Sequence, residues 1–247
     1  MEFIYIITLF VTLAAGFLSS LAGGGGSFIT TPYWLIAGLS PMQGATTGAF
    51  MGLGMSTSSV AAFRRSGHLP GDKKLILLLL VITLITSSIG PFFLPHVSTD
   101  VFKPILALLT IGSLPFLFID RGKIKLCTRN KYIGVVVISL LLLASSFITS
   151  SAFSILIAVT LLQMFHLTTM QGLAMRRLIS IVQSIVIFII LVTLGGFVWQ
   201  HAFAGLIGGS VGSYFGTKIM IRKGEKFAKY ALAIGAIIST SALFIIY

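Results

Sequence analysis

Acidic residues are scarce in this 247-residue sequence, which has 5 Asp and Glu against 17 Lys and Arg. The acids lie in expected loops or near the chain start: Glu2, Asp72, Asp100, Asp120 and Glu225. Intramembrane proton relays and strong sodium sites need buried carboxylates, so a cation substrate is not expected. With one cysteine, Cys127, and no Ser/His/acid set in an apolar run, the sequence also offers no disulfide framework, metal cluster or hydrolase triad. We therefore expect neither an enzyme nor a metal or cofactor site.

Charge of either sign is rare as well. Only 9% of residues are charged and 56% are hydrophobic, with a mean hydropathy of +1.07. A soluble domain is about one quarter charged, so a water-soluble globular fold is excluded. The net charge of +12 is then expected in loops that orient a membrane protein, and not in a nucleic-acid surface. We interpret Met1–Leu21 as a retained first span, because Glu2 stands where a signal peptide is basic.

Apolar runs separated by turn and charge signals divide the chain into two sets of segments, each ordered long, short, long, long, long. The first set is Phe3–Leu21, Phe28–Leu39, Pro41–Phe63, Leu75–Leu94 and Val101–Ile119. The second set is Tyr132–Ile148, Ala152–Phe165, Met170–Leu194, Phe197–Ile221 and Ala228–Tyr247. A helical span needs about 20 residues, so this pattern predicts an all-α integral membrane protein with about eight full spans and two short or broken helices. The predicted repeats are residues 1–125 and 126–247.

A short sequence match supports the repeat. Leu39-Ser-Pro-Met-Gln-Gly44 resembles Leu167-Thr-Thr-Met-Gln-Gly172, at an offset of 170 − 42 = 128. Each match places Ser40 or Thr168 just before a long apolar run, where its hydroxyl is expected to cap a helix. The alternative is a chance recurrence of Met-Gln-Gly in an apolar chain.

The basic residues indicate that the second repeat is inverted. The basic loops Arg64–Lys74 and Asp120–Lys131 are two spans apart, and the positive-inside rule places them in the cytoplasm. The repeat counterpart of the first, Gly195–His201, has no Lys or Arg, whereas the counterpart of the neutral loop Pro95–Asp100 is the basic segment Arg222–Lys229. This swap predicts an odd number of crossings in each half, five plus five, with both termini outside. If the short segments are re-entrant instead, the count is four plus four and Arg222–Lys229 lies outside.

Inverted repeats with interrupted helices are typical of secondary transporters, whose substrates bind near the breaks. One break is a glycine run that admits an anion close to the backbone: Gly23, Gly24, Gly25, Gly26 and Ser27. The other consists of Ser145, Ser146 and the stretch Thr149–Ser154, which includes Ser151; Ser154 falls on Gly26 at the repeat offset. The alternative for the glycine run is a tight crossing of two helices.

Arg176 and Arg177 lie about two turns into a long apolar run. Charge inside a membrane is unfavourable and usually faces a cavity or substrate path, so one of the two is a candidate ligand for an anion. The alternative is that both extend to the cytoplasmic surface as orientation anchors.

Gln43 and Gln171 occupy matching places in the two repeats, and their amides are candidate donors to an oxyanion. A helix-terminal hydrogen bond is the alternative for both. His166 can titrate, but a structural role is favoured. Gly44, Gly48 and Gly52 recur on one helix face, where close packing is expected, with Met51 and Met55 packing beside it.

The run from Gly16 through Gly23–Gly26 to Pro32, the turn Gly38–Pro41 and Arg64-Arg-Ser-Gly-His68 together resemble the first repeat of the TauE/SafE sulfite exporter family. The resemblance implies transport of small sulfur-containing anions, such as sulfite, thiosulfate and organosulfonates, and sometimes other organic anions. The second half departs from the family pattern, because Ser150–Ser154 stands where a glycine-rich motif is usual.

Taken together, these features predict a multi-pass transporter of the bacterial inner membrane. Its expected partners are a small anion, favoured to be a sulfur oxyanion or organosulfonate that is exported by alternating access, and the lipid bilayer; a homodimer is allowed and nucleic acid is not expected. The alternatives are a channel-like pore or a carboxylate transporter of the same fold, and a membrane scaffold without transport.

Overall fold

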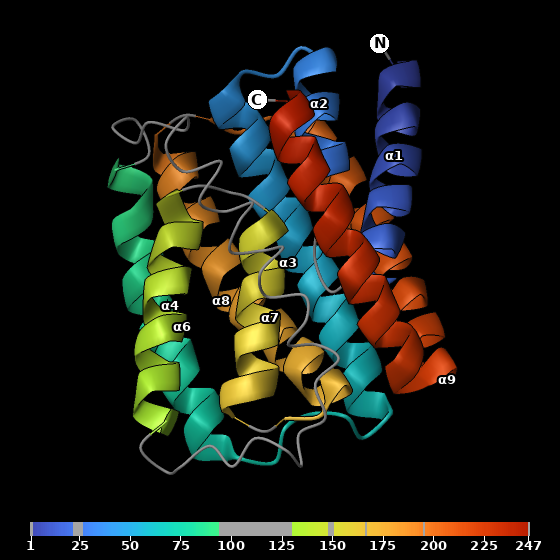
Figure 1. Cartoon of the computed structure of the whole chain (residues 1–247). Coiled ribbons are helices and arrows are strands. Elements are labelled where there is room, and N and C mark those ends of the chain that lie inside the picture. Colours follow the sequence, from blue (N-terminus) through green and yellow to red (C-terminus); the bar gives the residue numbers. More distant parts are fainter. Residues whose placement is uncertain are drawn as a thin grey trace.

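The protein is described by a computed structural model over residues 2–21, 27–93, 130–147, 151–165, 167–194 and 196–246. Within these ranges all regular secondary structure is helical and no strand occurs, which confirms the all-α prediction for the part described. The helices pack side by side in one bundle (Figure 1).

The first half contains a long, a short and two long helices: α1 (Glu2–Leu21), α2 (Ser27–Ile36), α3 (Pro41–Arg65) and α4 (Lys73–Phe93). The second half contains α6 (Asn130–Phe147), the short α7 (Ser151–Met164), α8 (Thr169–Thr193) and α9 (Trp199–Ile246). Both short segments expected from the sequence are therefore short helices. The expected span Val101–Ile119 and residues 120–129 of the following basic loop lie outside the described residues.

Helix α9 corrects one sequence prediction. Its backbone leaves the helical region at Gly224, where φ is 87° and ψ is −177°. A positive φ is readily adopted only by glycine, so this residue lets two helices meet at a sharp kink. The expected spans Phe197–Ile221 and Ala228–Tyr247 are thus joined through a kink, and Arg222–Lys229 is not the extended loop that was predicted.

Both described chain ends lie at the same end of the bundle (Figure 1). Helices α1 and α3 run away from that end, whereas α2 and α4 run toward it. In the second half the directions are reversed: α6 and α8 run toward it and α7 runs away from it. Close contacts show that α3 and α8 are antiparallel. Gly196, just after the end of α8, faces Met42 near the start of α3, and Gly52 farther along α3 faces Ser184 in α8.

Helix bounds coincide between the halves at the offset of 128. Equivalent bounds are the starts of α1 and α6 (130 − 2), the ends of α2 and α7 (164 − 36), and the starts and ends of α3 and α8 (169 − 41 and 193 − 65). One packing contact also repeats. A Cβ built on Gly44 would lie 3.1 Å from the Trp34 side chain, and one on Gly172 would lie 3.0 Å from that of Leu162, with 162 − 34 = 172 − 44 = 128.

The starts of α3 and α8 confirm the predicted helix caps. Ser40 and Thr168 have nearly identical extended backbones, with φ of −65° and −64° and ψ of 158° and 160°. Each hydroxyl accepts a hydrogen bond from the N–H three residues on, and each of those glutamines accepts one back from the cap N–H. This reciprocal pair satisfies two N–H groups that a helix start otherwise leaves open.

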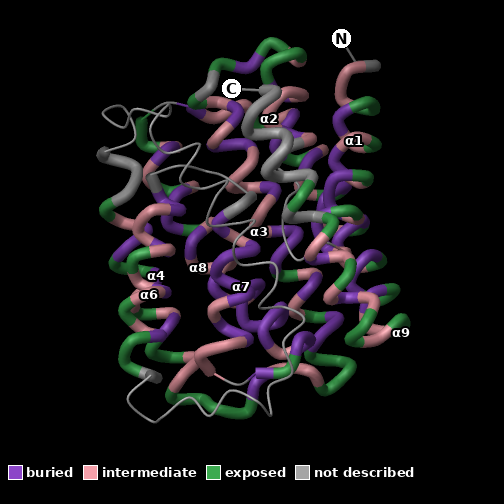
Figure 2. Tube along the Cα trace, in the orientation of Figure 1, coloured by how far each residue is buried: buried purple, intermediate pink, exposed green. Residues whose placement is uncertain are grey.

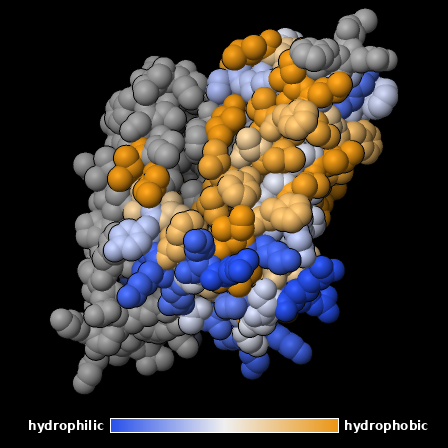
Figure 3. All heavy atoms as spheres, turned by 90° about the vertical axis from the view of Figure 1, so that its right-hand side faces the viewer, coloured by the Kyte–Doolittle hydropathy of each residue, from blue (hydrophilic) through white to orange (hydrophobic). Residues whose placement is uncertain are grey.

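Many apolar side chains lie on the outside of this bundle. Figure 3 shows them on one face, and Figure 2 shows which residues are buried. On the outer face of α9 exposed apolar residues recur every four positions: Phe203, Ile207, Val211, Phe215 and Ile219. Fully buried hydroxyl residues include Thr8, Thr12, Thr46, Ser59, Thr83 and Ser87. Two described helices, Ile4–Leu21 and Thr169–Thr193, are long and apolar enough to cross a membrane. This distribution suits a bundle surrounded by lipid, because water disfavours so large an apolar surface.

Glycines bring α9 against α1 at backbone distance. A Cβ at Gly208, Gly212 or Gly216 would fall on the carbonyl oxygens of Leu9, Leu13 and Phe17, closer than real Cβ contacts allow. Small residues at every fourth position permit such packing in membranes, where van der Waals contact drives helix association. The face Gly44, Gly48 and Gly52 also packs closely, against Trp34 and Ser184, and Met51 and Met55 are buried beside it, as predicted.

We expect Gly212→Ala to destabilise the bundle, because the new methyl group would overlap the backbone of α1 at Leu13. Overpacking of this kind costs about 1–3 kcal/mol, which should lower the thermal midpoint of the detergent-purified protein by several degrees. Gly71→Ala is the matched control, since nothing lies within 4 Å of a Cβ there and its φ is not positive. Equal midpoints for the two variants would contradict the close contact.

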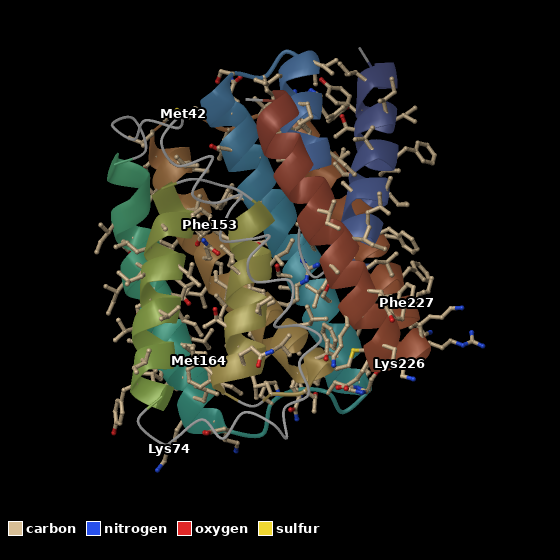
Figure 4. The ribbon with its side chains drawn as sticks, viewed as in Figure 1. Met42, Lys74, Phe153, Met164, Lys226 and Phe227 are labelled. Carbon is tan, nitrogen blue, oxygen red and sulfur yellow. The ribbon has the colours of Figure 1, made fainter. Side chains whose placement is uncertain are left out.

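The described basic loops lie together at the end opposite the chain ends. Lys74 and Lys226 project from this end in Figure 4, and Met42 lies at the other. After replacement of Cys127, we expect Ser66→Cys and Lys226→Cys to resist an impermeant thiol reagent added to intact cells, and Met42→Cys to react. Labelling of Lys226→Cys but not Ser66→Cys would instead favour the four-plus-four topology.

Candidate functional site

Two adjacent arginines are buried inside the bundle. Arg176 and Arg177 are 6% and 8% exposed, and they lie eight and nine residues into α8. At 1.5 Å per residue this places them about 10–12 Å from the start of the helix. Neither side chain extends to the surface, so the alternative that both are surface anchors is wrong.

The Arg176 guanidinium binds polar side chains of the second half. Its Nη1 donates to Ser180 Oγ at 2.7 Å, and its Nη2 donates to Ser154 Oγ at 2.9 Å and to Gln183 Oε1 at 3.4 Å. Gln183 is held in turn by α6, because its Nε2 donates to Ser145 Oγ at 2.9 Å. The Nε–H of Arg176 is buried and has no hydrogen-bond partner among the described residues.

The Arg177 guanidinium turns toward the first half. Its Nη2 donates to the backbone carbonyl of Ser19 at 2.9 Å and lies 3.4 Å from the hydroxyl oxygens of Ser19 and Ser20. Ser20 belongs to a buried hydroxyl cluster that joins α1, α3 and α9, which we define as Ser20, Ser59, Ser213 and Thr217. Arg177 therefore holds the last turn of α1 in contact with α8.

No carboxylate lies within ion-pair distance of either guanidinium in the part of the chain that the structure describes. The acids whose side chains are described act elsewhere. Glu225 Oε1 accepts from the Thr169 N–H at the start of α8, and Asp72 Oδ1 accepts from the N–H groups of Lys74 and Leu75 at the start of α4. Burial of an unpaired cation is unfavourable, so a nearby anion would stabilise both guanidiniums.

Each arginine contacts a helix end beside one of the two predicted helix breaks. Arg177 binds the end of α1, directly before Gly23–Gly26, and Arg176 binds Ser154 in the first turn of α7, directly after residues 148–150. Gly23, Gly24, Gly25 and Gly26 lie outside the described residues, as does His166. Ser27 and Ser151 begin α2 and α7, and the positions of their side chains are not described. The structure thus brings Arg176, Arg177 and Ser154 together with the end of α1.

Gln43 and Gln171 lie elsewhere. Each carbonyl oxygen accepts the cap N–H of its own helix, Ser40 at 2.9 Å and Thr168 at 3.1 Å, which is the helix-terminal alternative. Because α3 and α8 are antiparallel, the two amides lie at opposite ends of the bundle and not on either side of one site (Figure 1). A direct role of either amide in substrate binding stays a prediction.

The sequence analysis did not single out Ser19, Ser20, Ser180 or Gln183 as site residues. For two of them a signal exists: Ser180 and Gln183 follow Arg176 by four and seven residues, the spacing of one helix face. Ser19 and Ser20 come from α1, and no local spacing relates them to α8.

A second buried polar cluster lies between α1, α2 and α9. The Nδ1 atom of His201, a residue that is 6% exposed, lies 3.0 Å from Thr8 Oγ1, and Thr8 also contacts the Tyr33 hydroxyl. Tyr5 and Trp34 pack edge-on against the imidazole, with ring centroids 5.1 and 6.3 Å away. Thr8 and His201 are near the starts of α1 and α9, so this cluster is well separated along the bundle from the arginines.

Chemically, the arginine site can bind an oxyanion by charge-assisted hydrogen bonds from guanidinium and hydroxyl groups. Within the described ranges no three His, Cys, Asp or Glu side chains are grouped so that they could hold a metal ion.

Comparison with known proteins gives the family. The model of the family described as sulfite exporter TauE/SafE matches residues 8–243. The probable membrane transporter protein YfcA of Escherichia coli K12 is 27% identical over 250 residues, covering 96% of this chain and 89% of that protein. A probable membrane transporter protein of Haemophilus influenzae is 25% identical over 239 residues, covering 94% and 91%.

A shorter match is to the probable membrane transporter protein ORF9 of a Sinorhizobium species, 38% identical over 98 residues, covering 40% of this chain and 36% of that protein. No solved structure matches the chain. Because the family match extends over nearly the whole sequence, the chain belongs to the TauE/SafE sulfite exporter family of membrane transporters.

Proposed function

We propose that the protein transports a small anion across the bacterial inner membrane, and that the anion binds at Arg176 and Arg177. The observation that carries this proposal is that both guanidiniums are buried with only neutral oxygen acceptors among the described residues. Transfer of an ion into a protein interior costs several kcal/mol even after relaxation. A bound anion would offset that penalty for both arginines together.

The proposed substrate class is a sulfur oxyanion or an organosulfonate, exported from the cell. A guanidinium presents a planar fork of N–H groups that matches paired oxygens, and sulfite, thiosulfate and sulfonates all carry such oxygens. The description of the matching family as a sulfite exporter supports this choice. Carboxylates have the same paired oxygens, so a carboxylate transporter is the second candidate within the fold.

We further propose an inverted repeat that works by alternating access, with residues 1–125 and 126–247 as its halves. Support comes from the helix bounds that coincide at the offset of 128 and from the opposite helix directions in the two halves. Substrates of such transporters bind beside interrupted helices. Each arginine contacts a helix end beside one interruption, so the anion would be held where the two halves meet.

The proposed orientation follows from the basic residues. Exposed basic side chains gather at one end of the bundle: Arg64, Arg65, Lys73, Lys74, Lys218, Arg222, Lys223 and Lys226. The positive-inside rule assigns this end to the cytoplasm and both termini to the outside. Two subunits could associate through lipid-facing apolar surface, and a homodimer stays a prediction.

Uptake into proteoliposomes tests the function. We expect saturable uptake and counterflow for at least one of labelled sulfite, thiosulfate or a sulfonate, and slower uptake of a carboxylate. We expect at least one of Arg176→Ala and Arg177→Ala, but not necessarily both, to abolish it while membrane insertion is kept, because loss of a buried charge-assisted contact to the anion costs ~2–5 kcal/mol, a ~30-fold or larger loss of affinity. Normal transport by both single variants would contradict the site, and flux without saturation or counterflow would indicate a channel-like pore.

We also expect transport to be electrogenic and driven by the membrane potential. Where acid side chains are described, they lie at helix ends, outside the arginine site. Exit of a monovalent anion from a negative interior is favoured by a free energy of about 2.3 kcal/mol per 100 mV, which corresponds to a ~50-fold excess of the anion outside at equilibrium. Efflux should therefore follow a valinomycin-clamped potential and persist in His166→Ala and His201→Asn.

The control for this measurement is a strong-acid sulfonate, whose charge stays fixed over the pH range, whereas bisulfite can itself carry a proton. Sulfonate flux that follows the pH gradient and ignores the potential would replace this proposal with an electroneutral proton-coupled carrier.

A further inference from the structure

The two arginines differ in the kind of atom that each one holds. Arg177 donates to a backbone carbonyl, that of Ser19. Among the described residues, Arg176 donates only to side chains, the hydroxyls of Ser154 and Ser180 and the carboxamide of Gln183. Side chains can turn to admit a ligand, whereas the Ser19 carbonyl moves only with the end of its helix.

The Ser19 carbonyl belongs to the last turn of α1, which ends at Leu21. The last four carbonyls of a helix have no partner within the helix, and a cation there also interacts favourably with the helix dipole. The neighbouring Ser20 hydroxyl is 2.6 Å from that of Ser213, inside the buried hydroxyl cluster. Arg177 and this cluster together fix the point from which the chain enters Gly23–Gly26.

Arg176 retains donors that no described residue uses. The Nε–H is buried and unpartnered, and Nε–H and Nη2–H form one edge of the guanidinium. On that edge the Nη2 contact to Gln183 is long, at 3.4 Å, and is easily displaced. Ser154 Oγ accepts from Nη2, and its own proton has no acceptor among the described residues. An oxyanion on this edge would receive Nε–H, Nη2–H and the Ser154 hydroxyl.

We infer that Arg176, with Ser154, binds the transported anion, and that Arg177 is a positioning residue that holds the end of α1. This assignment rests on the proposed function. It gives the two arginines different roles: the contacts to the anion come from α7 and α8, whereas Arg177 holds the end of α1 from which the chain enters the first helix break.

The test compares Arg176→Gln with Arg177→Gln in detergent-purified protein. The thermal midpoint is measured against increasing sulfite, thiosulfate and 2-hydroxyethanesulfonate, with chloride keeping the ionic strength constant. A ligand that binds only the folded state stabilises it by RT ln(1 + L/Kd), where L is the free ligand concentration, so each titration of the midpoint gives an apparent Kd and a ligand-free midpoint.

We expect Arg176→Gln to weaken the apparent Kd by about 30-fold or more, with a ligand-free midpoint that is unchanged or higher because a buried unpaired charge is gone. We expect Arg177→Gln to lower the ligand-free midpoint and the maximal flux in proteoliposomes, and to change the apparent Kd by less than about threefold. Arg177→Lys, which can still donate to the Ser19 carbonyl, should restore the midpoint and the flux.

Two further variants test the Arg176 edge itself. Gln183→Glu keeps the side-chain shape and places a carboxylate next to Nη2. This carboxylate should compete with the anion for Arg176 and raise the Kd of the anion as much as Arg176→Gln does. Ser154→Ala should weaken the Kd about fivefold or more. Ser139→Ala is the matched control, because that half-buried serine on α6 donates only to the Val135 carbonyl of its own helix.

Equal loss of affinity in Arg176→Gln and Arg177→Gln would overturn the assignment of different roles to the two arginines, since the anion would then contact both guanidiniums. Retained affinity in Arg176→Gln or Gln183→Glu would overturn it as well. If none of the three anions shifts the wild-type midpoint or crosses the vesicle membrane, the proposed transport function itself fails, and that result is distinct from the other two.

Discussion

The hydrogen bonds from Arg176 and Arg177 connect α8 to two other helices, α7 in the second half and α1 in the first half. From one turn of α8, one guanidinium binds the end of α1 and the other binds the first turn of α7. Both groups are charged, both are buried, and the neutral oxygens around them satisfy only part of their donors. The helix ends beside both predicted breaks are therefore bound by a pair of cations whose charge is not balanced by the described side chains, and this imbalance is the basis of the proposed anion site.

The rest of the bundle supports that arrangement by keeping hydroxyl groups inside and apolar groups outside. Ser20, Ser59, Ser213 and Thr217 bond to one another between α1, α3 and α9 and adjoin Arg177 through Ser20. The glycines of α9 bring its backbone against that of α1, which leaves room there for little else. In lipid, where polar groups must find partners within the protein, such contacts hold the helices together.

The two halves use the same local devices at matching positions. The caps at Ser40 and Thr168 have the same geometry, and the glycine four residues after each cap packs against the preceding short helix. The arginine pair breaks this correspondence. At the offset of 128 Arg176 and Arg177 fall on Gly48 and Ala49, so both charges come from one half only. The function proposed for the site thus depends on an asymmetry within an otherwise repeated plan.

The sequence by itself determined the elements whose signals are local. Hydropathy located the long and short helices of the described ranges, and Ser40 and Thr168 marked helix starts, because each of these signals lies within one stretch of the chain. It could not show the joining of two expected spans at Gly224, since a single glycine fits a loop as well as a kink. Only the tertiary structure decided that the arginines are buried and face Ser19, Ser154 and Gln183, and that Gln43 and Gln171 lie at opposite ends. Those outcomes depend on which helices pack together and in which direction. Arg177 and Ser19 are 158 positions apart and Arg176 and Ser154 are 22 apart, so no helical spacing relates either pair.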